Sequence, residues 1–387
     1  MKYEFEAESC FEDLVRFRRD LHQIPELGNE ERKTHAYLWE HLSALEPDDL
    51  QVFAGTGIRA VFRGDGSGRV IAFRSDMDAL PVEEPEGCPF RSTHPGRMHA
   101  CGHDGHMATL LAFAKWISTR RSALRDDVVL IFQPAEETTG GAQRMIDEGV
   151  LKNPDVQAIY GMHMMPSVPI GHLAVREGPI MALTCEIDIL IDGKASHGAS
   201  PHLGRDAIMA MGHLLVLLQT TVARSLDPTV PALLTIGRCE AGVQRNILAD
   251  HAHLKGIIRT FSNEVFACLE ECIQNDLRGI EKAFGVQCEL RKYVFYPCTT
   301  NDPEETRRAV AVMGERYLPA NPLLIAEDFS CYQLQVPGVF IFTGCRDDAH
   351  QASLHAREFG FDEHALIPAL AYYAGMVGFR EDSHGTV

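Results

Sequence analysis

The sequence predicts an α/β protein: a catalytic domain with a largely parallel mixed sheet flanked by helices, and an inserted ferredoxin-like α+β domain. In the first domain, short continuous apolar runs, typical of strands buried on both faces, alternate with helical segments. Three of these runs end directly in polar residues that can bind metals. Beyond Gly178 the runs give way to alternating apolar and polar residues, which indicates strands with one solvated face and therefore a second domain.

The length and composition of the chain limit its organisation and its partners. At 387 residues it is long enough for two domains. We assign residues 1–181 and 295–387 to a discontinuous catalytic domain and residues 182–294 to an inserted lid and dimerisation domain. A content of 45% apolar and 23% charged residues is ordinary for a globular protein. The formal net charge of −18 argues against nucleic acid or an anionic membrane as a partner, because phosphate attracts the opposite charge.

The N-terminal sequence and the pattern of cysteines indicate the cellular compartment of the protein. The first residues contain no apolar run, and no uninterrupted apolar stretch of about 18 residues occurs anywhere. The 11 cysteines are scattered and form no CxxC pair, which is typical of reduced thiols rather than of a disulfide framework. We therefore expect a cytoplasmic protein.

Two helices are expected first. Apolar residues at helical spacing predict a helix over about residues 7–23, which Pro25 ends. A second helix follows Asn29, which we interpret as its cap, with acidic residues in its first turn. His22 is predicted to lie at the surface.

Two glycine-containing stretches follow. Gly55-Thr56-Gly57 lacks the third glycine and the strand-to-helix setting of a dinucleotide-binding loop, so we discard that function. Residues 63–66, Arg-Gly-Asp-Gly, predict a hairpin turn between strands at 58–62 and 70–73.

Candidate ligands follow three buried strands. The run at 70–73 leads to Asp76 and Asp78, which share a face if the strand continues that far. Two acids in a solvated loop remain an alternative. The run at 128–132 leads to Glu136 and Glu137, although a glutamate pair at a helix start is common. The strand at 158–162 ends on His163. Chance rarely places candidate metal ligands after three strands in succession.

The stretch at 98–107, Met-His-Ala-Cys-Gly-His-Asp-Gly-His-Met, has the composition of a cation site. In extended backbone Cys101 and His103 point to the same side, so a thiolate and an imidazole reach one ion. For any single residue here, a polar turn before a helix is the simpler interpretation. A core helix is expected at 108–117.

The inserted domain is expected to follow the order β-α-β-β-α-β, which is typical of a ferredoxin-like sandwich. Its expected elements are strands near 184–192, 233–237, 253–259 and 288–296, with helices near 206–223 and 264–284. From Asn301 the α/β character returns, with a strand at 339–342 and a helix at 362–377. His355 stands between these two, where a lone histidine is more often structural.

Together these residues supply the parts of a divalent-metal hydrolase. Such an enzyme needs several ligands, an open position for water and a carboxylate that accepts the proton of that water. The candidate ligands are Cys101, His103, one of the pair Glu136 and Glu137, His163 and His355. Because five ligands exceed what one four-coordinate zinc with an open position uses, two ions are expected. A thiolate favours Zn²⁺, whereas imidazole and carboxylate also admit Mn²⁺, Co²⁺ or Ni²⁺.

The chain resembles the aminoacylase-like amidohydrolases, the metallopeptidase group that includes hippurate hydrolase, N-acyl amino acid amidohydrolases and plant auxin-conjugate hydrolases. The resemblance covers essentially the whole chain. Its motifs are Arg19-Asp20-Leu21-His22, Pro25-Glu26, Asp76-Met77-Asp78-Ala79-Leu80-Pro81, residues 99–106, Gln133-Pro134-Ala135-Glu136-Glu137, Gly161-Met162-His163, Ser196-His197, Pro201-His202, Glu327-Asp328-Phe329-Ser330 and His355.

The resemblance implies a role for each matching residue. The implied ligands of two divalent ions are Cys101, His103, Glu137, His163 and His355. Glu136 is implied as general acid and base, and Asp78 as the residue that orients the site. His197 is implied to bind the oxyanion of a neighbouring subunit's substrate, in a homodimer or a dimer of dimers. Arg259 is our candidate for the substrate carboxylate, with help from Asn246, because a guanidinium matches a carboxylate at two points.

The expected reaction is hydrolysis of the amide bond of a small N-acyl amino acid, such as a hippurate-like or N-acetyl amino acid. The family's usual Asn-Val-Ile-Pro-Asp is Asn-Ile-Leu-Ala-Asp at 246–250 here, and its Gly-Thr is Gly-Ile at 256–257. Both departures lie in the inserted domain, so they concern substrate preference more than chemistry. Two alternatives remain, a dinuclear aminopeptidase or dipeptidase and a metal-dependent binding protein without turnover.

Overall fold

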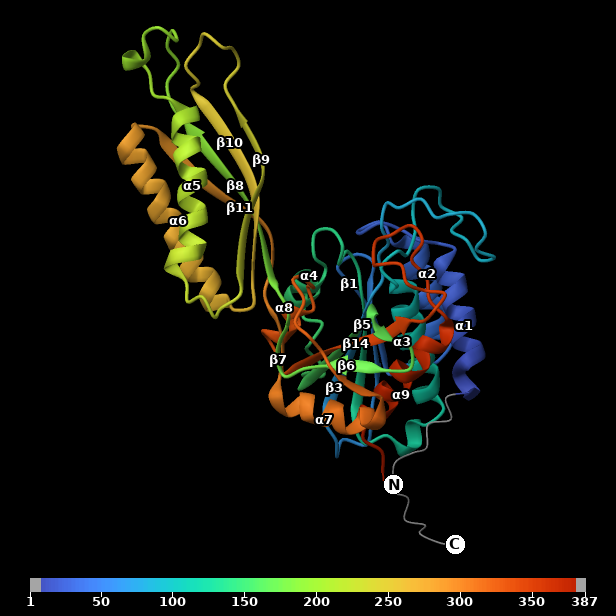
Figure 1. The fold of residues 1–387 in the computed structure, drawn as a ribbon. Coiled ribbons are helices and arrows are strands. Elements are labelled where there is room, and N and C mark those ends of the chain that lie inside the picture. The colour runs from blue at the N-terminus through green and yellow to red at the C-terminus, as the bar shows by residue number, and fades with distance from the viewer. Residues whose placement is uncertain (1–7, 381–387) are drawn as a thin grey trace. The chain divides into compact units, whose positions relative to one another are not determined.

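The computed structural model describes residues 8–380 and divides into two compact units. Unit 1 comprises Met1–Ile180, Thr300–Asn321 and Asp328–Val387, and unit 2 comprises Met181–Thr299 and Pro322–Glu327. Each unit has its own apolar core. Figure 1 shows the helices and strands of both units.

Unit 1 is built on an eight-stranded mixed sheet of order β1-β2-β4-β3-β5-β14-β6-β13. Its strands are β1 (Asp49–Phe53), β2 (Gly57–Phe62), β3 (Val70–Asp76), β4 (Asp127–Gln133), β5 (Ala158–Pro169), β6 (Leu173–Val175), β13 (Tyr317–Pro319) and β14 (Gly338–Arg346). The central strands β4, β3, β5 and β14 are parallel. They are almost completely buried, as the continuous apolar runs predict.

The order of the first strands differs from the expected hairpin. β4 lies between β2 and β3 and pairs with β2 antiparallel and with β3 parallel, so the turn at 63–66 joins strands that are not neighbours. The hairpin instead joins β1 and β2. Its turn contains Ala54 and Gly55, both with positive φ (48° and 86°), so the glycine that a dinucleotide loop would use serves a tight turn.

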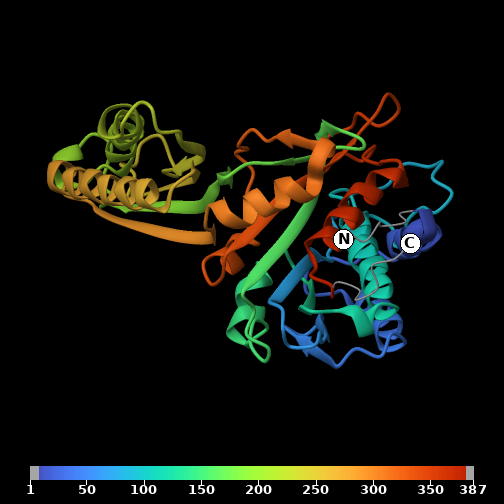
Figure 2. The ribbon, with the colours of Figure 1, turned by 90° about the horizontal axis from the view of Figure 1, so that it is seen from below.

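Helices cover both faces of this sheet. α3 (His103–Ser118) and α9 (Leu366–Met376) pack on one face with α1 (Glu8–His22) against α3, and α4 (Ala142–Asp147) and α8 (Ser330–Gln333) lie on the other (Figures 1 and 2). The remaining helices of unit 1 are α2 (Arg32–Ser43) and α7 (Pro303–Met313). The core joins residues of α1, α3 and α9 with the inner face of the sheet.

Two local predictions near the N-terminus are wrong. The second helix begins at Arg32 with Glu31 as its N-cap residue, so Asn29 lies outside it and no acidic residue stands in its first turn. Glu26 takes the place of the expected cap, because its Oε2 accepts the first-turn N–H groups of Lys33 and Thr34 at 2.8 and 2.9 Å. His22 is buried, with 4% of its surface exposed, because Asp104 and Glu84 bond to its ring.

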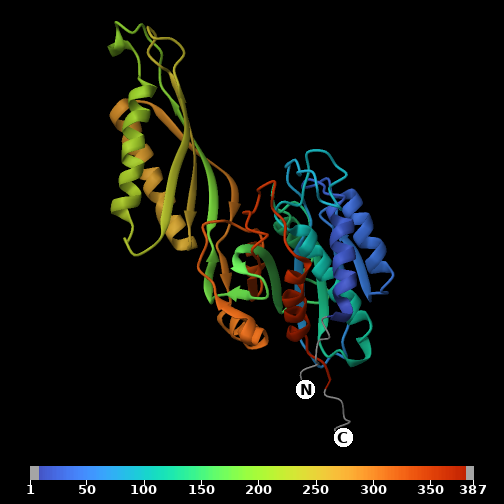
Figure 3. The ribbon, with the colours of Figure 1, turned by 45° about the vertical axis from the view of Figure 1, so that its right-hand side comes forward.

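Unit 2 is a two-layer sandwich in the order β-α-β-β-α-β (Figure 3). Its sheet, of order β11-β8-β10-β9, is fully antiparallel. The strands are β8 (Leu183–Asp192), β9 (Ala232–Ala241), β10 (His251–Thr260) and β11 (Gln287–Tyr296), and the helices α5 (Ala207–Ser225) and α6 (Asn263–Phe284) cover one face. This order and pairing are those of a ferredoxin-like sandwich. Two further short strands are β7 (Gly178–Met181) and β12 (Thr299–Asn301).

Side-chain caps fix the starts of both helices of unit 2. Asp206 accepts hydrogen bonds from the backbone N–H groups of Ile208 and Met209 at 2.9 and 3.1 Å, and Ser262 accepts one from Val265. Among the described residues, α5 alone is long and apolar enough to cross a membrane by length and composition. One such helix is weak evidence for a span, because helices that pack on a sheet, as α5 does, pass the same test.

Candidate metal centre

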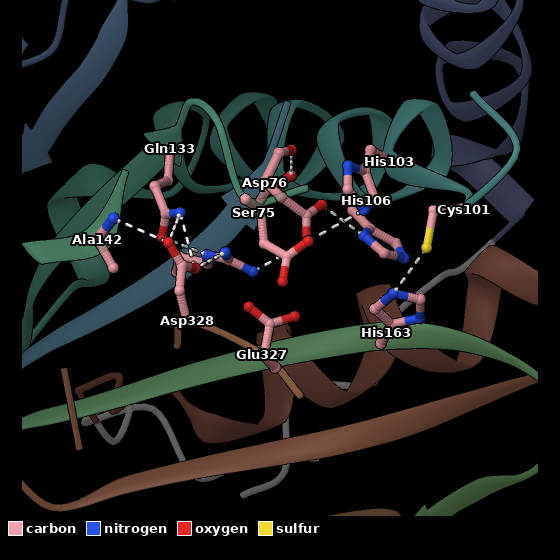
Figure 4. Close-up of polar contacts among 12 residues, drawn as sticks. Ser75, Asp76, Cys101, His103, His106, Gln133, Ala142, His163, Glu327 and Asp328 are labelled. Carbon is pink, nitrogen blue, oxygen red and sulfur yellow. Dashed lines mark hydrogen bonds and ion pairs between the residues drawn. The ribbon is translucent and has the colours of Figure 1, made fainter. Parts of the chain in front are cut away.

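The carboxyl ends of the central parallel strands bring the predicted ligands together. β3 ends at Asp76, β4 ends three residues before Glu136, and β5 carries His163. His163 lies inside β5 rather than at its end, because this strand continues to Pro169. Figure 4 shows Asp76 and His163 on the same side of the sheet as His103 and Cys101. This edge is where open α/β sheets form their sites.

A left-handed turn at Gly102 aims the first two ligands. Gly102 has a φ of 89°, and α3 begins at His103, so Cys101 and His103 are not the extended pair that we expected. The two side chains nevertheless converge, because the turn replaces the alternation of a strand. Candidate ligand atoms of Cys101, His103 and His163 lie within 4.8 Å of one another, and Cys101 Sγ is 3.3 Å from His163 Nε2.

Backbone carbonyl groups select the tautomers of both histidines. His103 Nδ1 is 2.8 Å from the carbonyl oxygen of Asp78, and His163 Nδ1 is 2.7 Å from that of Met164. Since a carbonyl only accepts, each Nδ1 donates, so in the neutral ring, the form that binds a metal, each Nε2 presents a lone pair. His103 Nε2 is buried without a hydrogen-bond partner among the described residues. Such an atom is costly unless it binds something, and a cation suits it.

The remaining predicted ligands approach from two loops. Cys101, Glu137 and His355 offer ligand atoms within 4.8 Å of one another. His355 Nε2 is 3.3 Å from Cys101 Sγ and 3.1 Å from Glu137 Oε1. His355 has a φ of 66°, and its backbone N–H donates to Ala100 at 2.9 Å, which ties its loop to the segment before Cys101.

A twist in the backbone lets the two adjacent glutamates serve one centre. Ala135, just before them, has a φ of 59°. The carboxylate of Asp78 then accepts the backbone N–H groups of Glu136 and Glu137 at 3.1 and 3.0 Å, one on each oxygen. Ligand atoms of Glu136, Glu137 and His103 lie within 4.8 Å of one another. Glu136 is buried, which places its carboxylate beside the cluster and away from bulk water.

Asp76 and His106 support the centre, a role that the sequence did not reveal. Asp76 Oδ1 accepts from His106 Nδ1 at 2.6 Å (Figure 4), and the backbone N–H of Met164 donates to His106 Nε2 at 2.9 Å. Both ring nitrogens of His106 therefore form hydrogen bonds, and these link Asp76 to the part of β5 that carries His163. The sequence pattern at 98–107 pointed to His103 as a ligand, but it did not show that His106 has a different, supporting role.

A buried arginine anchors this support. Arg74, 1% exposed, donates to Asp76 Oδ2 at 2.9 Å and to Asp328 Oδ1 at 2.8 Å. Gln133 accepts from Arg74 Nε at 2.9 Å and donates to Asp328 at 2.8 Å, and the N–H of Ala142 also donates to Asp328 (Figure 4). These contacts cross-link the ends of β3 and β4. Only the motif at Glu327-Asp328 hinted at this in the sequence.

The carboxylates leave the centre short of positive charge. Burial alone lowers the pKa of His103, but nearby carboxylates, Asp76 foremost, raise it to about 10. Burial raises the pKa of the Cys101 thiol well above its usual range, and the charges of Glu137 and Glu136 raise it further. Divalent cations would supply the charge that these groups lack. The donor set of thiolate, imidazole and carboxylate fits such ions.

The three other predicted residues lie in unit 2. His197 is exposed, and its Nδ1 accepts from the backbone N–H of Ala199 at 3.1 Å. Asn246 is exposed, and its backbone carbonyl oxygen accepts from the backbone N–H of Gly198 at 2.8 Å, so it neighbours His197. Arg259 is half-buried on β10, and burial lowers the pKa of its guanidinium.

Comparison with known proteins identifies the family. A model of the peptidase family M20/M25/M40 matches residues 72–378. The chain belongs to this family. N-acetyldiaminopimelate deacetylase of Limosilactobacillus fermentum is 38% identical to this M20 chain and covers 90% of it and 93% of its own length. N-acetylcysteine deacetylase of Bacillus subtilis is 36% identical, with coverages of 93% and 95%.

A solved structure agrees with this assignment. A Bacillus subtilis protein, described as a dinuclear metal binding peptidase from the M20 family, superposes with a TM-score of 0.83 at 34% identity and covers 95% of this chain and 97% of its own. The present chain is accordingly a metal-dependent amidohydrolase of the M20 family, an enzyme that hydrolyses the carbon–nitrogen bond of an amide.

Proposed function

We propose that this enzyme hydrolyses the non-peptide amide bond of N-acyl amino acids and releases a carboxylic acid and the free amino acid. The observation that carries the proposal is the buried Glu136 carboxylate beside a cluster of cysteine, histidine and glutamate ligand atoms. The named relatives are deacetylases of N-acetyldiaminopimelate and N-acetylcysteine. They favour a short acyl group, so N-acetyl amino acids come before hippurate among the substrates that we propose.

The cluster would hold two divalent ions. The five residues that we propose as ligands are Cys101, His103, Glu137, His163 and His355. Bound divalent ions polarise an amide carbonyl and make water a nucleophile near neutral pH. Zn²⁺ and Mn²⁺ are the first candidates, and Co²⁺ and Ni²⁺ also match these donors. The description of the Bacillus subtilis relative as dinuclear supports the number of ions.

Glu136 would carry the proton through the reaction. Its carboxylate accepts a proton from the attacking water as the oxygen bonds to the carbonyl carbon. The same proton then passes to the amide nitrogen, so that the carbon–nitrogen bond breaks with a neutral amine as the leaving group. The paired N–H contacts with Asp78 hold the backbone of Glu136 and Glu137, which keeps the base and the neighbouring ligand in fixed positions.

Unit 2 would supply substrate contacts. Because His197 Nδ1 accepts a hydrogen bond, its Nε2 carries the proton and can donate to an oxyanion. One such donor is typically worth about 3–4 kcal/mol at the transition state. Arg259 would bind the substrate carboxylate at two points, with Asn246 assisting.

We further propose that unit 2 acts as a lid and as the interface of a homodimer, in which His197 serves the partner's site. β9 and β11 are the edge strands of its sheet, and edges are prone to pair with another chain. α5 exposes Ile208, Met209 and Val216 to 44%, 49% and 70%. Burial of this apolar surface against a second copy would stabilise the dimer.

A substrate panel tests the proposal. The purified enzyme is assayed with N-acetyl amino acids, hippurate and free dipeptides, after loading with Zn²⁺ or Mn²⁺. We expect turnover of the N-acyl compounds and at most weak turnover of dipeptides. A preference for dipeptides would favour the alternative of a dinuclear aminopeptidase or dipeptidase. Binding of N-acyl amino acids without turnover would favour a binding protein.

Two adjacent variants separate the base from the ligands. Glu136→Gln should lower kcat by at least about 100-fold, since a general base typically contributes 10²–10⁴-fold, while metal content stays unchanged. Glu137→Gln should instead lose metal. Elemental analysis and steady-state kinetics measure both effects. Full turnover by Glu136→Gln on an N-acyl amino acid would remove Glu136 from the mechanism.

A further inference from the structure

A long loop connects two residues of the metal centre. Residues 81–97, between Asp78 and Cys101, contain no helix or strand. The loop is closed at its base by Leu80 and Met98, which exchange backbone hydrogen bonds of 3.0 and 3.1 Å. Ordered loops of this length are uncommon in compact domains and are usually functional.

Three donor side chains meet where this loop passes the end of α1. They are His22, the last residue of α1, and Glu84 and Cys88 of the loop, and their ligand atoms lie within 4.8 Å of one another. His22 Nε2 is 3.1 Å from Glu84 Oε1. Burial raises the pKa of the Cys88 thiol, and the neighbouring Glu84 carboxylate raises it further. His22 and Glu84 are buried and Cys88 is half-buried, so an ion from solvent can reach the cluster.

Asp104 orients the imidazole of His22. Its Oδ2 lies 2.8 Å from His22 Nδ1 and also accepts from Arg18 Nε at 3.2 Å. The Nδ1–H of His22 therefore points to Asp104, and its Nε2 faces Glu84 and Cys88. A carboxylate behind the outer nitrogen of a histidine is the arrangement that orients metal-binding imidazoles.

Unpartnered polar atoms lie beside the same cluster. Both ring nitrogens of His99 and Asp104 Oδ1 are buried and have no hydrogen-bond partner among the described residues. His99 and Asp104 are only 2% and 1% exposed. The His99 ring centroid is 6.4 Å from that of His22. Buried polar atoms without partners call for an ion or an ordered water nearby.

We propose that His22, Glu84 and Cys88 bind one zinc ion, which none of the ligands of the metal centre contacts, and that water completes a tetrahedral coordination. Imidazole, carboxylate and thiolate are the three side-chain donors that Zn²⁺ takes in proteins. Bonds of 2.0–2.1 Å in a tetrahedron set nitrogen and oxygen ligands roughly 3.3 Å apart, close to the 3.1 Å between His22 Nε2 and Glu84 Oε1.

The zinc ion takes the place of two protons. Burial alone lowers the pKa of His22, but the hydrogen bond and charge of Asp104, helped by Glu84, raise it to about 9. Without a metal, His22 is therefore an imidazolium between two carboxylates, and burial keeps Cys88 a thiol. Binding of Zn²⁺ releases both protons, so the charge of the cluster does not change. Zinc affinity therefore falls as the pH falls.

The ion would fasten the loop to α1. Glu84 and Cys88 belong to the loop and His22 to the core helix, so one ion links the two. Because the loop leads from Asp78 to Cys101, the link also restrains both segments that enter the metal centre. The role is structural, so substrate turnover at moderate temperature does not require it.

The test counts zinc in the full-length enzyme. The wild type and Cys88→Ser are stripped with a chelator, reloaded with Zn²⁺, freed of excess metal and analysed for zinc per chain. We expect Cys88→Ser to hold one zinc fewer than the wild type, with unchanged kcat and a lower melting temperature. Cys239→Ser, a change of an exposed cysteine on β9, should match the wild type. The difference between the proteins does not depend on which substrate the enzyme hydrolyses.

A second measurement uses the wild type alone. Alkylation with iodoacetamide, read by mass spectrometry at Cys88, should be slower with Zn²⁺ bound than after chelation. If circular dichroism shows that Cys88→Ser folds, the zinc count tests the proposal. If the variant does not fold, the alkylation of the wild type tests it. Equal zinc in both proteins, or alkylation of Cys88 that ignores zinc, would overturn the site and leave an ion-paired His22.

Discussion

Asp78 affects the metal centre through backbone amide groups. Its two carboxylate oxygens accept the N–H groups of Glu136 and Glu137, so one side chain holds the proposed base and an adjacent proposed ligand. Glu31 continues this support, because its Oε1 accepts the N–H of Ala135 at 2.9 Å and its Oε2 accepts from the Thr56 hydroxyl. Ala135 keeps its positive φ within this frame.

We expect Asp78→Asn to lower turnover or metal affinity by about 10–100-fold, the usual effect of changing a group behind metal ligands. The asparagine amide can accept only one of the two N–H groups and turns its own N–H₂ towards the other. Kinetics and metal titration measure the loss.

Asp302→Asn is the matched control. Asp302 also accepts two adjacent backbone N–H groups, those of Glu304 and Glu305, both at 2.9 Å, but it caps α7. Its substitution should leave kcat and metal content unchanged. An equal loss in both variants would mean that the effect of Asp78→Asn is one of general stability.

At the scale of elements, the start of α3 depends on a left-handed glycine. Gly102 lies between Cys101 and His103 at a φ of 89°, and a Cβ there would lie 3.1 Å from Met164 Cγ. The turn thus determines both the first residue of the helix and the approach of two proposed ligands. Met164 follows His163 on β5, so a shift at this point would also disturb a third ligand.

Gly102→Ala should lower the stability of unit 1 by about 1–2 kcal/mol, because a Cβ disfavours the left-handed region, and should weaken metal binding. Gly279→Ala is the control, and it should raise the stability of unit 2 instead of lowering it. A Cβ at Gly279, inside α6, meets nothing within 4 Å, and alanine gains about 0.5–1 kcal/mol over glycine in a helix. Calorimetry, which resolves separate transitions, measures both. A stabilised Gly102→Ala would contradict the argument from backbone strain.

Local patterns in the sequence predicted the elements but not every neighbour. Continuous apolar runs located β3 and β4, and alternation located β8, because burial on one or both faces leaves a trace within each strand. The insertion of β4 between β2 and β3 left no such trace, since pairing is decided by strands distant in sequence. The proposed metal ligands were recognisable because cysteine, histidine and glutamate side chains cluster in a few short motifs of the sequence.

Supporting residues were harder to predict. Arg74 follows an apolar run, where a charged residue usually marks the return to solvent, yet it is buried because Asp328, 254 positions away, neutralises it. His22 was predicted at the surface for the same reason. Its carboxylate partners, Glu84 and Asp104, are 62 and 82 positions away, and nothing in the helical pattern of α1 indicates them.

At the scale of the whole molecule, the proposed dimer predicts that two inactive proteins restore each other. Glu136→Gln and His197→Ala subunits, mixed and allowed to exchange, should form some dimers in which one site has both an intact Glu136 and the partner's intact histidine. With random pairing about a quarter of the sites are intact, because half of the dimers are mixed and each has one such site. Activity before and after exchange measures the recovery.

The controls for this experiment are each variant alone and a mixture kept from exchanging, all of which should stay inactive. Native mass spectrometry of subunits with different mass labels shows whether exchange has occurred. No recovery in a fully exchanged mixture would refute the action of His197 across an interface, and an oligomer count of one would refute the dimer itself.

The short segment Pro322–Glu327 constrains how unit 2 could be exchanged between relatives. It belongs to unit 2, although it is far along the chain from Met181–Thr299. The backbone N–H of Ala182 donates to the carbonyl oxygens of Leu323 and Ile325 at 3.0 and 2.9 Å. A chimera that grafts residues 181–299 alone would pair Ala182 with residues 322–327 of the recipient protein instead of its own. Recombination, natural or engineered, therefore has to move two separate pieces of the gene together to transfer unit 2 intact.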